Sequence, residues 1–343
     1  ITNANGETLG YGDVVNEAAA LEVPKNVKLK DPKDYNIIGT DAINVDIDKI
    51  TTGKPLFGLD YKAEGMVYAS VLRPPSFGKK LKSFDATKAK KVNGVLDVFQ
   101  FGEKLKSIEN QAGRFTRITD KIAVVATSTW AAMKGKKALE VVWENESKLE
   151  NTEDHDKELF KILDGKKFST PREDGNVNKA FSNADKVIEK TYESPFLPHN
   201  CMEPMNFYAD VTSDKIHLVG PTQTPAWAQG MIAAAYKMKP EQIHIEMTRM
   251  GGGFGRRLYN DFLLEAAEVS SVIQKPVKVV FSREDDMAAG TYRPAIKYRI
   301  KGALKDGKVT GYHLKEAAIN GNMYGLISNF FPAGCIPNYK VST

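Results

Sequence analysis

Apolar residues along this chain follow two periods, and clusters of proline and glycine separate the segments. Alternating or continuous apolar runs of four to eight residues predict strands, whereas apolar residues three and four positions apart predict helices. The predicted strands are 66–73, 95–101, 122–126, 140–143, 216–220, 243–248, 277–281, 295–304 and 309–319. The predicted helices are 11–21, 85–91, one that starts at Ser128 or Thr129, one near 156–163, 224–238 and 258–274. Helices and strands in this mixture predict an α+β fold.

The order of the elements divides the chain into regions. Residues 51–145 have the predicted order β-α-β-β-α-β, which indicates a two-layer α/β domain. Residues 146–186 are polar and are interpreted as a linker with one short helix, and residues 187–343 as a second, mixed α/β domain. Residues 1–50 are interpreted as a lead-in segment. A length of 343 residues suits two domains at roughly 100–200 residues each.

Composition and charge exclude several classes of protein. Hydrophobic residues make up 42% and charged residues 27%, which excludes a disordered tail or a fibrous protein. The net charge of +5 comes from lysines spread along the chain, so we expect no nucleic-acid partner. Residues 317–339 carry no charge, but their asparagine, glycine and proline residues predict an irregular loop and no membrane span.

Cysteine and histidine spacing predicts no metal centre. The two cysteines are far apart and form no CxxC motif. His199 and Glu203 are four residues apart, but the prolines around them disfavour a helix, so we expect these side chains to have packing roles. The other histidines have no partner at ligand spacing in the sequence, and the two on strands are interpreted as surface or interface residues. These are His155, His217, His244 and His313.

The most distinctive segment is the turn Gly251-Gly252-Gly253-Phe254-Gly255-Arg256-Arg257, which lies between a predicted strand and a predicted helix. Glycines let the backbone approach a ligand closely, and a helix N-terminus followed by two arginines suits an anionic group. The dinucleotide fingerprint would need a glycine at Arg256, and a P-loop would end in Gly-Lys-Ser/Thr. A nucleotide-binding dehydrogenase is therefore disfavoured, and the remaining alternative is a tight turn without a ligand.

In this turn and in other segments the chain resembles the molybdenum hydroxylases, the xanthine dehydrogenase and aldehyde oxidase family. It is most similar to the large (beta) subunit of isoquinoline 1-oxidoreductase and its relatives. The supporting segments are Tyr11-Gly12, Val27 to Pro32, Arg73-Pro74-Pro75, Trp130-Ala131-Ala132, Met202-Glu203-Pro204-Met205, Pro221 to Trp227, the glycine turn with Asp261, and Ser282 to Asp286. The block from Pro221 to Asp286 is the specific part of this resemblance.

The resemblance implies a fold and a set of site residues. Residues 51–145 would form the family's two-layer α/β hammerhead domain, and residues 187–343 its mixed α/β first molybdopterin-binding domain, truncated here. The implied cofactor-binding residues are Gln223, Gly251, Gly252, Gly253, Phe254, Gly255 and Arg256. In the family pattern, a glutamine at the position of Gln223 donates a hydrogen bond to the metal's oxo ligand. The alternative for Gln223 is a simple turn residue before a helix cap.

The resemblance also implies an activity. The cofactor would be molybdopterin with molybdenum, as the cytosine dinucleotide of bacterial enzymes. The substrate would be an N-heteroaromatic compound or an aldehyde, hydroxylated with oxygen from water. Leu258 falls where purine-oxidising relatives have a glutamate, which argues against xanthine. Electrons would leave through a small subunit that carries [2Fe-2S] clusters.

The catalytic glutamate of the family lies in a second cofactor domain, so we expect no catalytic residue in this chain and no activity of this fragment alone. Relatives are often exported folded by the twin-arginine route, which favours a periplasmic location. The alternative function is a non-catalytic scaffold or binding module of the same fold that does not load molybdenum.

Overall fold

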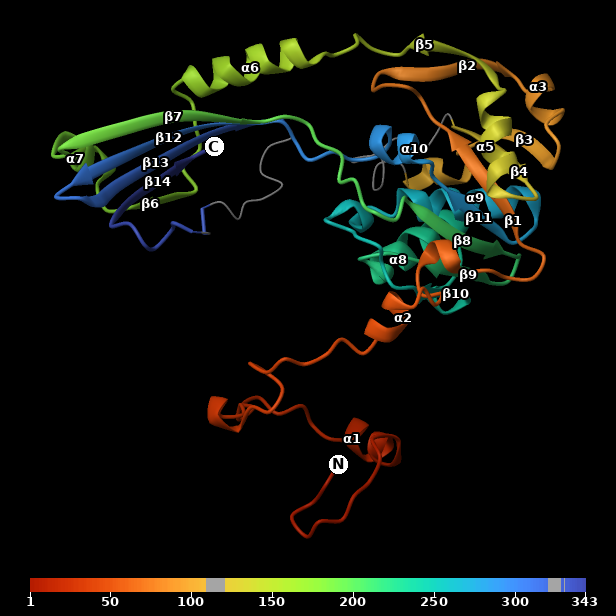
Figure 1. Ribbon diagram of the computed structural model, residues 1–343, viewed down its shortest axis with the longest axis horizontal. Helices are drawn as coiled ribbons and strands as arrows, with labels where there is room; N and C mark the ends of the chain where they lie inside the picture. The colour runs from red at the N-terminus through yellow and green to blue at the C-terminus, as the bar shows by residue number, and fades with distance from the viewer. Residues whose placement is uncertain (109–120, 320–327, 330) are drawn as a thin grey trace. The chain divides into compact units, whose positions relative to one another are not determined.

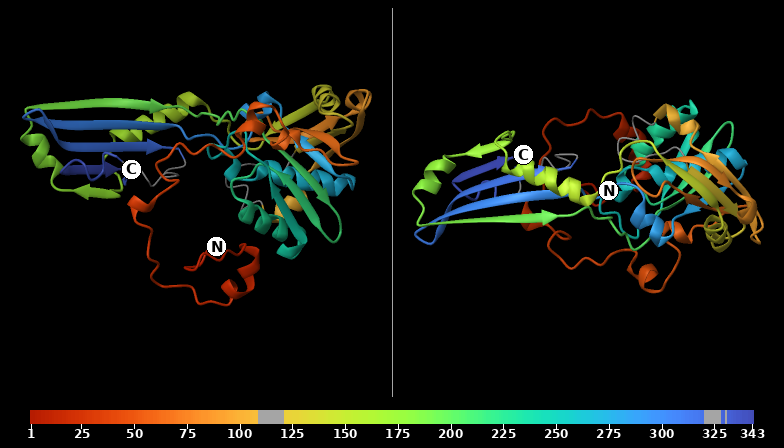
Figure 2. Two further views of the ribbon diagram at one scale, coloured as in Figure 1. Left: turned by 60° about the horizontal axis from the view of Figure 1, so that its bottom comes forward. Right: turned by 90° about the horizontal axis from the view of Figure 1, so that it is seen from above.

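The computed structural model describes residues 1–108, 121–319, 328–329 and 331–343 (Figure 1). The chain divides into two compact units, Ile1–Lys54 and Pro55–Thr343. The first unit is an almost fully exposed trace with short helical elements (Figure 2). These are η1 (Gly12–Val14), α1 (Val15–Ala19), η2 (Pro32–Asp34) and α2 (Ile47–Thr51). The predicted helix 11–21 is therefore shorter than expected.

A seven-stranded sheet forms the centre of the second unit, with the strand order β10-β9-β8-β11-β1-β4-β3. Its strands are β1 (Val67–Leu72), β3 (Val95–Phe101), β4 (Lys121–Ala126), β8 (Asn206–Val211), β9 (Ile216–Gly220), β10 (Ile243–Met247) and β11 (Val277–Val280). β1 and β11 pair in parallel through Val67↔Val277 and Ala69↔Val279. Strands from the two predicted domains, residues 51–145 and 187–343, thus share one sheet. The domain boundaries stay a prediction.

Two helices, α8 (Pro225–Tyr236) and α9 (Asp261–Ile273), contribute to the main hydrophobic core. Phe262 of α9 lies against Phe207 of β8, with ring centroids 5.8 Å apart. α9 is buried on every side from Asp261 to Ser270. It begins three residues later than predicted, because Arg256–Leu258 forms the separate 3₁₀ turn η6.

A smaller layer consists of β2 (Lys79–Asp85) paired with β5 (Glu140–Asn145), together with α3 (Thr87–Lys90) and α5 (Thr129–Lys137). The N-cap of α5 is Ser128, whose Oγ accepts a hydrogen bond from the Ala131 N–H at 3.2 Å. β2 is absent from the predicted order because lysines dominate its sequence. Only Leu81 and Phe84 of this strand pack into the adjacent hydrophobic cluster.

A five-stranded sheet with the order β6-β14-β13-β12-β7 forms the remainder of the unit (Figure 1). Its strands are β6 (Arg172–Asp174), β7 (Lys186–Ser194), β12 (Ile296–Lys305), β13 (Lys308–Ala318) and β14 (Asn338–Ser342). The predicted hairpin is confirmed, because Asp306 and Gly307 both have positive φ in a two-residue turn between β12 and β13. α6 (Thr152–Asp164) contributes Leu159 and Leu163 to a cluster with Ala295 and Ala317.

The other short elements of the unit are η3 (Gly58–Asp60), η4 (Lys104–Ile108), α7 (Val177–Ser182), η5 (Pro240–Gln242) and α10 (Arg283–Ala288). The loop predicted within 317–339 lies partly outside the described residues. Among the described helices, none has the length and apolar character needed to cross a bilayer.

Buried charges connect α9 to the sheet. The carboxylate of Glu265 is fully buried and accepts hydrogen bonds from the Lys121 Nζ at 2.7 Å and from the Arg73 Nε at 3.0 Å. Lys121 begins β4, and Arg73 directly follows β1. Removing one member of a buried ion cluster leaves an uncompensated charge, which costs far more than the loss of a surface pair.

We therefore expect Glu265→Gln to lower the free energy of unfolding by about 3–5 kcal/mol in urea titrations of the whole chain. The matched control is Glu140→Gln, which breaks the exposed pair of Glu140 with Lys88. This control should leave the unfolding midpoint unchanged. Equal effects of the two substitutions would refute the structural importance of the buried cluster.

Candidate functional site

Two neighbouring parallel strands position the residues predicted to form the site. β9 and β10 pair in register from Ile243↔Ile216 to Met247↔Gly220. Gln223 follows β9 and the glycine turn follows β10, so both segments leave the same edge of the sheet. The Gln223 side chain lies against Gly253, since a Cβ added at Gly253 would be 2.7 Å from the Gln223 Oε1. The structure thus brings together the two predicted parts of the site.

Hydrogen bonds fix the orientation of the Gln223 amide. The Gln223 N–H donates to the Arg257 carbonyl at 3.1 Å, and the Arg257 N–H donates to the Gln223 Oε1 at 3.2 Å. A backbone N–H needs an acceptor, so the oxygen of the amide must face it. The Nε2 group makes no hydrogen bond with any residue that the structure describes, and the side chain is exposed. Gln223 therefore presents a hydrogen-bond donor at the surface.

The glycine turn presents a row of main-chain donors. Gly252, Phe254 and Gly255 have φ of +103°, +51° and +96°, a conformation that glycine adopts at little cost. The turn is closed by a hydrogen bond from the Arg256 N–H to the Gly253 carbonyl at 2.8 Å. Within the described part of the chain, the N–H groups of residues 252–255 donate no hydrogen bond. Successive N–H groups of this kind bind anions or other strong acceptors.

The two arginines of the turn point away from this donor row. Arg256 is buried and pairs through both terminal nitrogens with Asp261, at 2.6 and 2.8 Å. Burial opposes ionisation of Asp261, but Arg256 together with Lys121 and Arg73 outweighs it and lowers the pKa of this carboxyl below its ordinary value. The Arg257 guanidinium is fully buried and donates to the carbonyls of Gly252 and Glu203, each at 2.8 Å.

The guanidinium groups therefore do not offer charge to a ligand, contrary to the expectation from the sequence. Any cofactor contact of Arg256 would have to come from its main chain. The assignment of Arg256 and of the other site residues to cofactor binding stays a prediction.

Glu203 holds the glycine turn in place. Its Oε2 accepts a hydrogen bond from the Gly251 N–H at 2.8 Å and lies 3.3 Å from the Arg257 Nη2. Its Oε1 accepts from the Leu59 N–H at 3.1 Å and the Asn206 Nδ2 at 2.9 Å. A Cβ at Gly251 would be 2.4 Å from the Glu203 Cβ, so only glycine fits there. The packing role predicted for Glu203 is confirmed, but its contact with the turn could not be inferred from the sequence.

His199 lies beside the same turn. Its Nε2 would be 3.7 Å from a Cβ placed on Gly255. Burial, together with the positive charges of Arg256 and Arg293, lowers the pKa of His199 to about 4. The ring is therefore neutral at physiological pH. No spacing motif in the sequence indicates this position.

The structure corrects the prediction that the strand histidines lack partners. Ligand atoms of His217, His244 and Glu246 all lie within 4.8 Å of one another. The parallel register places His244 next to His217 on adjacent strands. The register between two strands cannot be predicted from their separate sequences. The spacing of His217 and His244 along the chain therefore did not indicate that they are neighbours.

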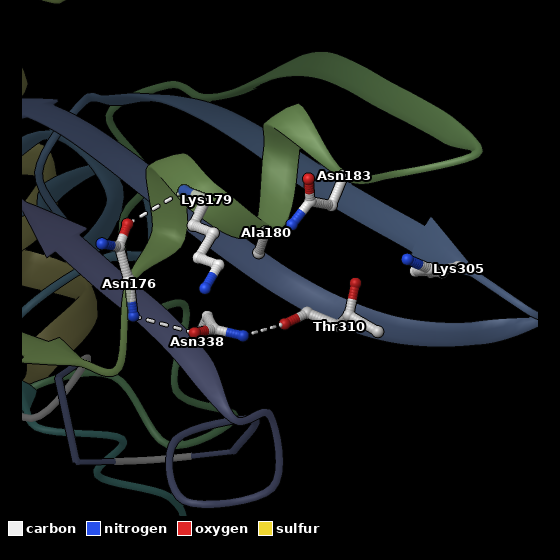
Figure 3. Close-up of a pocket in the computed structure, with 7 residues that line it drawn as sticks. All are labelled: Asn176, Lys179, Ala180, Asn183, Lys305, Thr310 and Asn338. Atoms are coloured by element: carbon white, nitrogen blue, oxygen red, sulfur yellow. Dashed lines mark hydrogen bonds between the residues drawn. The ribbon is translucent and has the colours of Figure 1, made fainter.

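A pocket of about 220 Å³ lies on the five-stranded sheet and is drawn in Figure 3. Its lining residues are Asn176, Lys179, Ala180, Asn183, Lys305, Thr310 and Asn338. Asn338 accepts from the Asn176 N–H and donates to the Thr310 carbonyl, both at 2.8 Å. The pocket shares no residue with the glycine turn or with Gln223.

A family profile described as the molybdopterin cofactor-binding domain matches residues 160–338, which is more than half of the chain. The chain belongs to this family. The match begins in α6 and includes Gln223 and the whole glycine turn.

Curated relatives extend the similarity to most of the chain. A membrane-bound aldehyde dehydrogenase of Gluconacetobacter polyoxogenes, named for pyrroloquinoline quinone, is 27% identical over 93% of this chain and 41% of its own length. The beta subunit of isoquinoline 1-oxidoreductase from Brevundimonas diminuta is 27% identical over 85% of this chain and 37% of its own length. The large molybdopterin subunit of nicotinate dehydrogenase from Eubacterium barkeri is 28% identical over 81% of this chain and 69% of its own length. The chain thus spans only about two fifths of the first two of these proteins.

Solved structures share the fold. Aldehyde oxidoreductase from Desulfovibrio desulfuricans matches with a TM-score of 0.67 and 16% identity, over 87% of this chain and 37% of that one. Quinoline 2-oxidoreductase from Pseudomonas putida 86 matches with a TM-score of 0.62 and 18% identity, over 81% of this chain and 39% of that one. The predicted mixed α/β fold is confirmed at this level.

We expect Gly251→Ala to destabilise the chain by about 1–3 kcal/mol in urea unfolding, because the new methyl group overlaps Glu203. The matched control is Gly230→Ala, which replaces an interior glycine of α8 with nothing within 4 Å of the new Cβ. Alanine at this helical position should stabilise by roughly 0.5–1 kcal/mol. If Gly251→Ala did not lower the free energy of unfolding, the close packing of Glu203 against Gly251 would be refuted.

The lowered pKa of His199 predicts a direction of pH dependence. A histidine whose pKa is lower in the folded chain stabilises folding fully above its unfolded pKa, near 6.5, and loses this contribution as the pH falls towards 4. Unfolding midpoints should therefore decrease between pH 6.5 and 4, and they should decrease less in His199→Asn. The assignment would be contradicted if the unfolding midpoints of both proteins changed equally with pH. It would also be contradicted if the NMR signal of the His199 imidazole titrated near pH 6.5.

Proposed function

We propose that this chain is part of the large subunit of a molybdenum-dependent hydroxylase. In this proposal, Gln223 and the turn over residues 251–255 hold one side of a molybdopterin cofactor. One observation carries the proposal: the Gln223 amide lies next to the glycine turn, and neither its Nε2 group nor the N–H groups of residues 252–255 donate a hydrogen bond within the described structure. Both lie in the segment that the cofactor-binding family matches. The hammerhead assignment of residues 51–145 belongs to the same proposal.

The residues at the turn fit such a group. Pterin, phosphate and metal-bound oxygen atoms are hydrogen-bond acceptors, and the site offers neutral donors next to the exposed Arg293, whose guanidinium lies 3.4 Å from the Phe254 carbonyl. Glycines at 252, 253 and 255 keep side chains away from the donor row. Phe254 is 64% exposed and adds an apolar surface next to it.

Each part of the chain would have a defined task in the reaction. When bound, the cofactor would supply the redox chemistry that hydroxylates an electron-poor carbon with oxygen from water. The Gln223 Nε2–H would donate to an acceptor atom of the cofactor and respond to its change in charge. The row of N–H groups would fix the orientation of the cofactor. Glu203 and Arg257 would keep this row in position without touching the cofactor.

The names of the relatives support a substrate class. They include enzymes for isoquinoline, nicotinate and aldehydes, so we propose an N-heteroaromatic compound or an aldehyde as the substrate. We further propose the cytosine dinucleotide form of the cofactor and a partner subunit with [2Fe-2S] clusters. By its resemblance to the family, Leu258 falls where purine-oxidising relatives have a glutamate, which disfavours xanthine.

One relative is named for a different cofactor, pyrroloquinoline quinone. The family match over residues 160–338 favours molybdopterin. Two measurements on the full-length protein with its partners, purified from the native host, separate the two cofactors: elemental analysis detects molybdenum and iron, and mass spectrometry of an extract of the denatured protein detects the quinone. Molybdenum together with excess iron would support the hydroxylase and its iron–sulfur partner. A quinone without molybdenum would overturn the proposal, and neither cofactor, in cells whose other molybdoenzymes are loaded, would favour the scaffold alternative.

We expect Gln223→Glu to lower kcat of the assembled enzyme by about 10²-fold, because a carboxylate offers no donor to the cofactor. Molybdenum content should stay unchanged, since the backbone donors remain. The control is Gln100→Glu, which makes the same amide-to-carboxylate change at an exposed position of β3 and should have wild-type kcat. Wild-type kcat in Gln223→Glu with full molybdenum loading would reduce Gln223 to a turn residue.

A further inference from the structure

We propose that His217, His244 and Glu246 bind a divalent transition-metal ion on the surface of the seven-stranded sheet. The site is separate from the glycine turn and does not depend on the proposed molybdenum chemistry. Two imidazole nitrogens and one carboxylate oxygen form a ligand set that suits Zn²⁺ or Cu²⁺ rather than Ca²⁺ or Mg²⁺.

Strand geometry directs the three side chains to one face. His217 of β9 is paired with His244 of β10, and Glu246 lies two residues further along β10. Side chains alternate between the two faces of a strand. The alternate residues Ile216, Leu218 and Ile243 are buried in the core, so the histidines and the glutamate occupy the opposite face.

The ligand atoms lie within 4.8 Å of one another, close to the spacing around a tetrahedral ion. The Glu246 Oε1 lies 2.8 Å from the His217 Nε2 and 3.3 Å from the His244 Nε2. Ligands about 2.0–2.1 Å from Zn²⁺ lie roughly 3.3 Å from each other, so small side-chain rotations would admit the ion. The three protein ligands leave a fourth position for water.

The surroundings favour a cation and leave the site accessible. Asp210 of β8 lies directly across from His217 in the antiparallel register and adds a second negative charge beside the site. The side chains of His217, His244 and Glu246 are 32%, 71% and 51% exposed. An ion could therefore enter without any rearrangement of the backbone.

The position of this site suggests a role for the metal. Among the described strands, β10 lies at the end of the sheet order and pairs with β9 alone. The same two strands lead to Gln223 and to the glycine turn. A metal bound to both strands would link them by coordinate bonds and stabilise the edge from which the candidate cofactor site extends.

The test is calorimetric titration of the untagged full chain with Zn²⁺ after removal of metals with a chelator. We expect one equivalent of Zn²⁺ to bind, and His244→Gln and Glu246→Gln each to weaken the affinity at least tenfold. His155→Gln is the matched control, because His155 contacts Glu150 at 2.7 Å but has no third ligand in the described structure. This control should bind Zn²⁺ like the wild type.

Two results would overturn the proposal: the absence of stoichiometric binding, or equal affinity in wild type, His244→Gln and Glu246→Gln. Substitution with Co²⁺ adds a second readout, since a thiolate charge-transfer band would assign the metal to a cysteine instead. Hydrogen exchange tests the role of the metal: Zn²⁺ should slow exchange of the β10 amides in wild type and not in Glu246→Gln. Binding without this protection would refute the link between the strands. None of these measurements requires molybdenum, so the two proposals can fail independently.

Discussion

The fold of the larger unit depends on three carboxylates buried along one side of helix α9. Asp261, Glu265 and Glu268 follow each other at spacings of four and three residues, which places them on one face of the helix. Each finds a partner from a different part of the chain. Asp261 pairs with Arg256, Glu265 binds Arg73 and Lys121, and Glu268 accepts from the N–H groups of residues 102 and 104. A buried charge without its partner costs several kcal/mol, so these segments must assemble around the helix together.

The need to pair buried charges also determines which groups the glycine turn presents to a ligand. Asp261 and Glu203 neutralise Arg256 and Arg257 inside the protein. The turn itself then exposes neutral donors, namely the backbone N–H groups of residues 252–255 and the amide of Gln223, and the charge beside it comes from Arg293, whose guanidinium lies 3.4 Å from the Phe254 carbonyl. Such a row of N–H groups binds anions and other strong acceptors, and its geometry decides which acceptor atoms it can reach.

The sequence predicts those parts whose information is local. β3 and β9 were predicted to the residue because their apolar residues face the core, whereas β2 and β7 were missed because lysines and glutamates cover them. The glycine turn was found because conformation is encoded in the glycines themselves. The direction of Arg257 was not, since it depends on Glu203, which lies about fifty residues away. The contact between His217 and His244 depends on strand register and was missed for the same reason.

Because the candidate site consists of main-chain donors, only a few positions of its sequence require a particular residue type. The N–H groups belong to whichever residues occupy the turn, so the chemistry constrains backbone conformation more than side-chain identity. Gly251 must avoid Glu203, and residues 252 and 255 have positive φ, which favours glycine at both positions. Phe254 has the same left-handed conformation with a large side chain, which its exposed position accommodates. Under the proposed function, side chains around this frame would determine the substrate preference, and Leu258 in the turn η6 would be one of them.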